Sequence, residues 1–140
     1  SKTKVIIVVS LFGQCPNFSE IKKLIKDKKI YLIEDAAQSF GAKHKAKNSC
    51  NIADISITSF FPTKTLGSFG DGGAIFTNKK KISKKIFSLR NHGQSKKKYF
   101  HDYIGLNARL DTIQAAVLLV KLKKIKKLLK LRQLKAKNYF

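Results

Sequence analysis

The chain has few cysteines and no pattern of metal ligands. Its 140 residues contain two cysteines, Cys15 and Cys50, which do not form a Cys-x-x-Cys pair. This spacing argues against a zinc site and against a disulfide framework, so we expect two reduced thiols. The histidines His44, His92 and His101 show no metal-ligand spacing either.

Long apolar runs are also missing. No stretch approaches the roughly 20 apolar residues that a membrane-spanning helix needs. The apolar stretch Val5–Val9 is too short for the core of a secretory signal. The absence of both features predicts a cytoplasmic protein without a membrane span.

Acidic residues are scarce: 8 Asp and Glu stand against 30 Lys and Arg, which gives a net charge of +22. A charge of this size keeps binding to nucleic acid or to an anionic surface open as one function. Only Arg90, Arg109 and Arg132 are arginines, although base readout and bidentate phosphate contacts favour arginine. We therefore expect solvated surface lysines and no specific nucleic-acid site.

What remains is the composition of one globular domain over residues 1–140, with 43% hydrophobic and 27% charged residues. Two short apolar runs, Val5–Val9 and residues 30–33, predict buried strands. Between them we expect a helix that is capped by Ser19 and runs to about Lys28. Strand, helix and strand in this span form a βαβ unit, so a parallel sheet is expected.

Further elements follow along the chain. We expect a turn or short helix at residues 36–42 and a polar loop at residues 43–51. Alternating side chains predict a strand at residues 55–60, and a further strand is expected at 74–77. Residues 80–89 have the pattern of a helix.

A long helix is expected at about residues 111–137. Asp111 and Gln114 have the spacing of a capping box at its start. Apolar residues recur along it at steps of four, three and four, at Leu118, Leu122, Ile125 and Leu129. We interpret it as an amphipathic packing helix, and its lysine-rich opposite face leaves a membrane surface as the alternative.

Two charged residues lie at positions where ligand-binding or catalytic residues are common. Asp35 directly follows an apolar strand, at the edge of a parallel sheet where ligands bind, although an acidic helix cap is the alternative. Lys64 is isolated in an uncharged stretch between Ser59 and the glycines of residues 67–73. That loop lacks the Gly-Lys-Ser/Thr ending of a nucleotide P-loop. An isolated lysine on such a loop can be a Schiff-base nucleophile or a solvated surface charge.

Four stretches together carry a resemblance to a known family. They read IEDAAQSFGA (33–42), TSFFPTKTLGSFGDGGAIFTN (58–78), LRNHGQ (89–94) and IGLNARLDTIQAAVL (104–118). In this order and spacing they resemble the sugar aminotransferases of the DegT/DnrJ/EryC1/StrS family, which depend on pyridoxal 5′-phosphate (PLP). The resemblance runs from about Lys4 to Lys123. It implies an α/β fold of the aspartate-aminotransferase type (PLP fold type I), with a mostly parallel sheet, flanking helices and a homodimer.

The same resemblance implies roles for residues around the PLP ring. Lys64 matches the lysine that holds the cofactor covalently as a Schiff base. Asp35 matches the aspartate that pairs with the protonated ring nitrogen, and a Lys plus an Asp is the expected signature of this cofactor. Gln38 matches a glutamine beside the ring, near the ring hydroxyl.

Three more residues are implicated at the phosphate and the substrate. Ser59 matches a serine that binds the cofactor phosphate, and Asn107 matches an asparagine that reaches the phosphate from the other subunit. Arg109 is expected to meet a substrate carboxylate or phosphate across that interface. The alternative for Arg109 is a structural ion pair.

The implied activity is the transfer of an amino group to a nucleotide-linked keto-sugar, in surface-polysaccharide or amino-sugar biosynthesis. Glutamate is the expected donor, and Lys64 moves a proton between the substrate α-carbon and the cofactor C4′. The wording SFFPTK at residues 59–64, with Ser49 and Cys50, is most similar to branches that act on 3-keto sugars. These include UDP-N-acetyl-3-keto-glucuronate.

The chain departs from the family's pattern in two respects. Members are longer, with an N-terminal segment that supplies further phosphate contacts and a C-terminal small domain, so residues 1–140 match part of the large domain. Residues 9–13 also read Val-Ser-Leu-Phe-Gly where members often have Val-His-Leu-Tyr-Gly. An inactive remnant of such an enzyme is therefore a further alternative.

Overall fold

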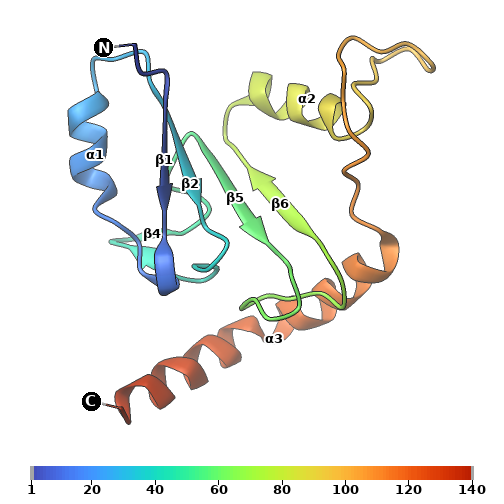
Figure 1. The fold of residues 1–140 in the computed structure, drawn as a ribbon. Coiled ribbons are helices and arrows are strands. Elements are labelled where there is room, and N and C mark those ends of the chain that lie inside the picture. The colour runs from blue at the N-terminus through green and yellow to red at the C-terminus, as the bar shows by residue number, and fades with distance from the viewer. Residues whose placement is uncertain (1, 140) are drawn as a thin grey trace.

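A four-stranded sheet forms the centre of the molecule, in the order β1-β2-β5-β6 (Figure 1). The computed structural model describes residues 2–139. Strands β1 (Val5–Val9), β2 (Tyr31–Asp35) and β5 (Ile55–Ser59) are parallel. Strand β6 (Gly73–Phe76) runs antiparallel to β5. The predicted strands and the parallel βαβ unit are confirmed.

Helix α1 (Phe18–Ile25) connects β1 and β2 after a short 3-10 turn, η1 (Leu11–Gly13). The prediction that Ser19 caps this helix is wrong. The side chain of Asn17 accepts the hydrogen bond from the Glu20 amide, whereas Ser19 Oγ lies 3.0 Å from His44 Nε2. The helix also ends at Ile25, earlier than predicted.

The predicted polar loop at residues 43–51 contains a small antiparallel hairpin. Strand β3 (Lys43–His44) pairs with β4 (Lys47–Asn48). The turn between them places Lys45 at a φ of 54°. The loop prediction is therefore wrong for these four residues, because two-residue strands leave too short a pattern to recognise.

One face of the sheet holds a hydrophobic core. Phe18 from α1, Leu32 from β2 and Ile52 before β5 are 1%, 1% and 5% exposed. Because successive strand residues point to opposite faces, their neighbours along the strands lie on the other face. That face carries exposed apolar side chains at Val5, Ile7, Val9, Tyr31, Ile57 and Ile75.

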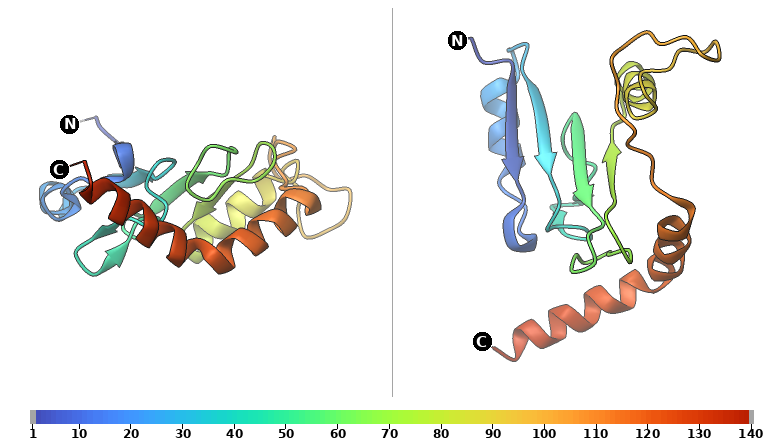
Figure 2. Two further views of the ribbon diagram at one scale, coloured as in Figure 1. Left: turned by 90° about the horizontal axis from the view of Figure 1, so that it is seen from below. Right: turned by 45° about the vertical axis from the view of Figure 1, so that its right-hand side comes forward.

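Helix α2 (Lys80–Leu89) follows β6, and helix α3 (Thr112–Lys137) crosses the edge at which the parallel strands end (Figures 1 and 2). Asp111 Oδ1 caps α3 by accepting the Gln114 amide at 2.8 Å. None of the helices within residues 2–139 is both long and apolar enough to cross a membrane.

The predicted apolar stripe of α3 is only partly buried. Leu118 is 7% exposed and packs with Phe60 and Leu66 in a second core cluster, which Ile125 flanks. Leu122 is 45% exposed, so the prediction that it packs inward is wrong.

Candidate active site

The carboxyl edge of the parallel strands brings Asp35 and Ser59 together. Asp35 is the last residue of β2 and lies opposite Ile57 of β5. Ser59 lies two residues further along β5, so its side chain leaves the same face as that of Asp35. The Ser10 amide donates to the Asp35 carbonyl at 2.9 Å, which aligns the end of β1 with this edge.

Local hydrogen bonds hold Asp35 and Gln38. Asp35 Oδ1 accepts from the Ala37 amide at 3.0 Å, a turn that aspartate forms with its own backbone. Gln38 Oε1 accepts from the Phe12 amide at 3.0 Å. This bond fixes the orientation of the Gln38 amide group and leaves its nitrogen, a donor, for a ligand.

Lys64 lies on the loop that leaves β5. Its amide donates to the Phe61 carbonyl at 2.9 Å, and its side chain is half-buried. Ser59 Oγ accepts from the Phe61 amide at 3.2 Å, so the Ser59 hydroxyl keeps its proton to donate elsewhere. The loop therefore presents an amine and a hydroxyl donor.

Backbone hydrogen bonds close this loop at its base. The Ser68 amide donates to the Phe60 carbonyl at 2.7 Å, and the Phe60 amide donates to the Gly72 carbonyl at 2.8 Å. A Cβ at Gly67 would meet the Phe61 carbonyl oxygen at 2.8 Å and the carbonyl of Pro62. Glycine at 67 thus permits a close return of the backbone.

Side chains of helix α3 form hydrogen bonds with the backbone of the same loop, and the sequence pattern did not predict these contacts. Lys121 Nζ donates to the Gly67 carbonyl at 2.6 Å and lies 5.1 Å from the centre of the Phe69 ring. Gln114 Oε1 accepts from the Phe69 amide at 2.7 Å. These contacts join residues 45 to 54 positions apart, and no local pattern signals them.

Asn107 and Arg109 lie apart from this cluster, on the connection between α2 and α3. Both are exposed, and Arg109 Nε donates to Asn107 Oδ1 at 3.1 Å. The alternative of a structural ion pair for Arg109 finds no support. Within residues 2–139, the salt bridge between Lys79 and Asp54, at 3.1 Å, is the only one.

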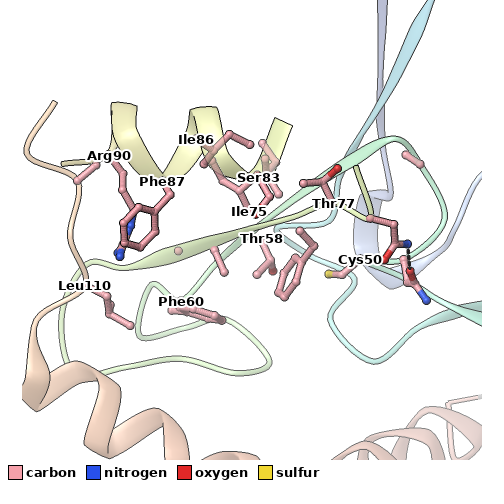
Figure 3. Close-up of a pocket in the computed structure, with 18 of the residues that line it drawn as sticks. Cys50, Thr58, Phe60, Ile75, Thr77, Ser83, Ile86, Phe87, Arg90 and Leu110 are labelled. Carbon is pink, nitrogen blue, oxygen red and sulfur yellow. Dashed lines mark hydrogen bonds between the residues drawn. The ribbon is translucent and has the colours of Figure 1, made fainter. Parts of the chain in front are cut away.

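A cavity of about 970 Å³ lies between α2 and strands β5 and β6 (Figure 3). Apolar side chains such as Ile75, Ile86 and Phe87 line much of it, with Arg90 at one end. Of the six predicted site residues, only Arg109 is in its lining. We therefore place the candidate site at the carboxyl edge of the sheet, around Asp35, Ser59 and Lys64, and not in this cavity.

Both cysteines are free thiols, as predicted. Burial, and then the negative charge of Glu34, raise the pKa of Cys50 to about 11. The same two causes raise the pKa of Cys15. Within the described residues, no group of three or more His, Cys, Asp or Glu side chains is placed to hold a metal ion.

The side chains at the edge fit PLP in their chemistry. A carboxylate such as Asp35 suits a protonated ring nitrogen, and the amine of Lys64 suits the aldehyde carbon. The Ser59 hydroxyl and the Gln38 amide nitrogen are donors for phosphate and ring oxygens. Each of these four side chains therefore has the donor or acceptor that its predicted partner requires.

Comparison with known proteins identifies the family of the chain. The chain matches the DegT/DnrJ/EryC1/StrS aminotransferase family over residues 1–140. It is 50% identical over 138 residues to the UDP-2-acetamido-2-deoxy-3-oxo-D-glucuronate aminotransferase of Pseudomonas aeruginosa. The match covers 99% of this chain and 38% of that protein, so the chain spans less than half of the relative's length.

Solved structures agree on the fold. A DegT DnrJ EryC1 StrS aminotransferase from Brucella abortus matches with a TM-score of 0.86 and 42% identity, over 89% of this chain and 33% of that one. NtdA from Bacillus subtilis, with the bound cofactor PMP, matches with a TM-score of 0.80 and 32% identity, over 88% and 28%. The predicted PLP type I fold is confirmed. The chain belongs to the DegT/DnrJ/EryC1/StrS aminotransferase family.

Proposed function

We propose that this chain carries the cofactor lysine of a PLP-dependent sugar aminotransferase, which moves an amino group from glutamate to a nucleotide-linked keto-sugar. The observation that carries the proposal is the shared position of Asp35, Gln38 and Ser59 at one sheet edge, with Lys64 on the loop that follows. The Pseudomonas aeruginosa relative, named for a UDP-linked 3-oxo sugar, supports the substrate class.

Four side chains would hold the cofactor. Asp35 would bind the ring nitrogen, Gln38 Nε2 would donate beside the ring, and Ser59 Oγ would donate to the phosphate. Lys64 Nζ would form the covalent link. Bound PLP supplies an electron sink for the carbon that carries the amino group.

Lys64 has the second role of moving a proton. Its amine would take a proton from the substrate α-carbon and hold it for return, as general base and then acid. The hydrogen bond from the Lys64 amide to the Phe61 carbonyl fixes the backbone from which this side chain reaches. A fixed backbone limits the positions that the amine can adopt, which favours a productive geometry.

We further propose a homodimer in which Asn107 and Arg109 complete the site of the partner copy. Both side chains are exposed, and no hydrogen bond joins either of them to Asp35 or Lys64 within residues 2–139. Asn107 would contact the phosphate, and Arg109 an anionic group of the substrate. The cytoplasmic location stays a prediction from the sequence.

A half-reaction tests the proposal. The full chain is incubated with PLP and glutamate, and 2-oxoglutarate is measured against the amount of bound cofactor. We expect one 2-oxoglutarate for each bound PLP, and a large loss in the Asp35→Asn variant, because the neutral amide cannot pair with a protonated ring nitrogen. Binding of PLP without any 2-oxoglutarate would support the inactive remnant instead.

A second measurement separates the enzyme from a nucleic-acid binder. We expect binding to a DNA duplex to weaken uniformly with added salt and to be independent of sequence, as it is for surface lysines. Tight, sequence-dependent binding with no PLP uptake would favour the nucleic-acid alternative.

A further inference from the structure

Glu34 is a fully buried carboxylate with hydrogen bonds on both oxygens. Its exposed fraction is 0%. Oε1 accepts from Ser10 Oγ at 3.2 Å and from Ser49 Oγ at 2.7 Å. Oε2 accepts from Ser56 Oγ at 2.9 Å and from the Cys50 amide at 3.0 Å. The transamination proposed above assigns no role to this group.

The donors around Glu34 match an ionised carboxylate. The Cys50 amide can only donate, and a hydroxyl has one proton to give. Since Ser49 donates to Glu34, the 2.6 Å contact between Ser39 Oγ and Ser49 Oγ requires Ser39 to be the donor. No basic side chain lies within 4.0 Å of the carboxylate among residues 2–139. Hydrogen bonds alone therefore compensate the burial of this charge.

The donors come from segments far apart in the sequence. Ser10 follows β1, Ser56 lies directly opposite Glu34 on β5, and Ser49 and Cys50 belong to the connection after β4. Glu34 is thus the common acceptor of three segments that meet beside the last residues of β2.

Asp35 is the next residue and points to the opposite face, because strand residues alternate. Its backbone lies between the same segments: the Ser10 amide donates to the Asp35 carbonyl at 2.9 Å, and the Ala36 amide donates to the Ile57 carbonyl at 2.8 Å. Any shift of the backbone at Glu34 is therefore passed to the Asp35 side chain.

We propose that Glu34 is a positioning residue for Asp35. The buried Glu34 carboxylate ties the segment after β1, the start of β5 at Ser56 and the connection after β4 to β2, and so fixes the position of Asp35. This role toward the cofactor rests on the proposed function, in which Asp35 binds the ring nitrogen. Glu34 acts through Asp35 and does not itself touch the cofactor.

The test uses the full chain with Glu34→Gln, which keeps the shape of the side chain and removes its charge. The matched control is Glu20→Gln on the exposed surface of α1, the same chemical change away from the site. Asp35→Asn and the double variant complete a cycle. The first readout is the dissociation constant of PLP, which is measured by absorbance.

We expect Glu34→Gln to weaken PLP binding by roughly tenfold, the lower end of what loss of a supporting partner costs a ligating group. In the Asp35→Asn background, the same change should alter the constant by no more than about twofold. Glu20→Gln should bind as the wild type does. Equal losses from Glu34→Gln in both backgrounds would overturn the proposal, because Glu34 would then act independently of Asp35.

The second readout needs no cofactor. Hydrogen exchange is measured at the Ala36 and Ala37 amides, which bond to the Ile57 carbonyl and to Asp35 Oδ1, and at the Arg90 amide beyond α2 as a reference. In Glu34→Gln we expect faster exchange at Ala36 and Ala37 and no change at Arg90. Equal acceleration at all three sites would show a general loss of stability and would overturn the positioning role.

Two outcomes separate this inference from the proposed function. A wild type that binds no PLP would contradict the proposed function, while hydrogen exchange would still decide the role of Glu34. If Glu34→Gln does not fold, Ser56→Ala removes one donor and keeps the charge, and the same exchange pattern is expected from it. Unchanged exchange in a folded Ser56→Ala chain would then count against the proposal.

Discussion

Asp35 and Ser59 leave the same face of the sheet from neighbouring parallel strands, because Asp35 pairs with Ile57 and Ser59 follows two residues later. An acid and a hydroxyl are thereby presented at one edge without any contact between them. The strand register, and not a local motif, sets their spacing. Ligand sites of open α/β sheets use this edge for the same reason.

The glycine at position 67 should be required for the shape of the loop that leaves β5 and carries Lys64, the lysine loop of residues 60–72. In Gly67→Ala the new Cβ would meet the Phe61 carbonyl oxygen at 2.8 Å, and backbone cannot yield as a side chain can. We expect a loss of about 1–3 kcal/mol in the free energy of unfolding and weaker PLP uptake. The measurement is chemical denaturation together with PLP titration.

Gly70→Ala is the control for that substitution. A Cβ at Gly70 would meet only the flexible Gln114 side chain, at 3.0 Å. We expect a smaller loss of stability than in Gly67→Ala. Equal losses in the two variants would show that loop closure at residue 67 does not matter.

Lys121 should support the lysine loop through its bond to the Gly67 carbonyl. In Lys121→Met, which keeps the apolar stem, we expect PLP binding to weaken by about tenfold or more, as loss of a hydrogen bond from a charged donor predicts. Lys124→Met makes the same change at an exposed position of α3 and should leave binding unchanged. Titration of both variants with PLP, followed by absorbance, shows whether Lys121 supports the loop through this hydrogen bond or is only a surface charge.

The core on the α1 face should carry much of the stability. Leu32 is 1% exposed, so Leu32→Ala removes buried volume and should lower the free energy of unfolding by about 2–5 kcal/mol. Leu24→Ala, at a leucine that is 70% exposed, should change it by no more than about 0.5 kcal/mol. Urea denaturation of both variants checks the difference, and similar losses would contradict the described packing.

The strands and helices were largely predictable from the sequence, because each has its own periodic pattern. Asp35 was placed at the sheet edge from the apolar run that precedes it, and the Asp111 cap of α3 followed from its spacing to Gln114. These features depend on residues within a few positions of one another. Local pattern is sufficient where the interactions are local.

Contacts between distant segments escaped prediction. Ser19 was expected to cap α1, but its hydroxyl lies beside the ring of His44, 25 residues away. The side chain of Asn17 caps the helix instead. Glu34 has no local pattern that indicates its role, because its four donors come from residues 15 to 24 positions away. A single sequence carries no signal for such pairings.

Cys50 should react slowly with alkylating reagents. Burial, and then the charge of Glu34, raise its pKa from 9.0 to about 11. A rise of two units lowers the thiolate fraction at pH 8 by about 100-fold. In a Cys15→Ser background, we expect the alkylation rate to rise with pH up to about 11.

Removal of the Glu34 charge should make Cys50 more acidic. A nearby negative charge disfavours the thiolate, so Glu34→Gln should move the midpoint of the alkylation profile to lower pH. The control Glu20→Gln should leave the midpoint unchanged. A wild-type midpoint near 9.0, or no shift in Glu34→Gln, would contradict the described surroundings of Cys50.

Covalent attachment of PLP to Lys64 tests the central claim most directly. The full chain is mixed with one equivalent of PLP, reduced with borohydride, digested and mapped by mass spectrometry. We predict that the label resides on Lys64 and that absorbance at the edge of the visible range is lost in Lys64→Ala but kept in Lys80→Ala, a change on the exposed surface of α2. A label spread over the surface lysines, or the same absorbance in Lys64→Ala, would contradict the assignment.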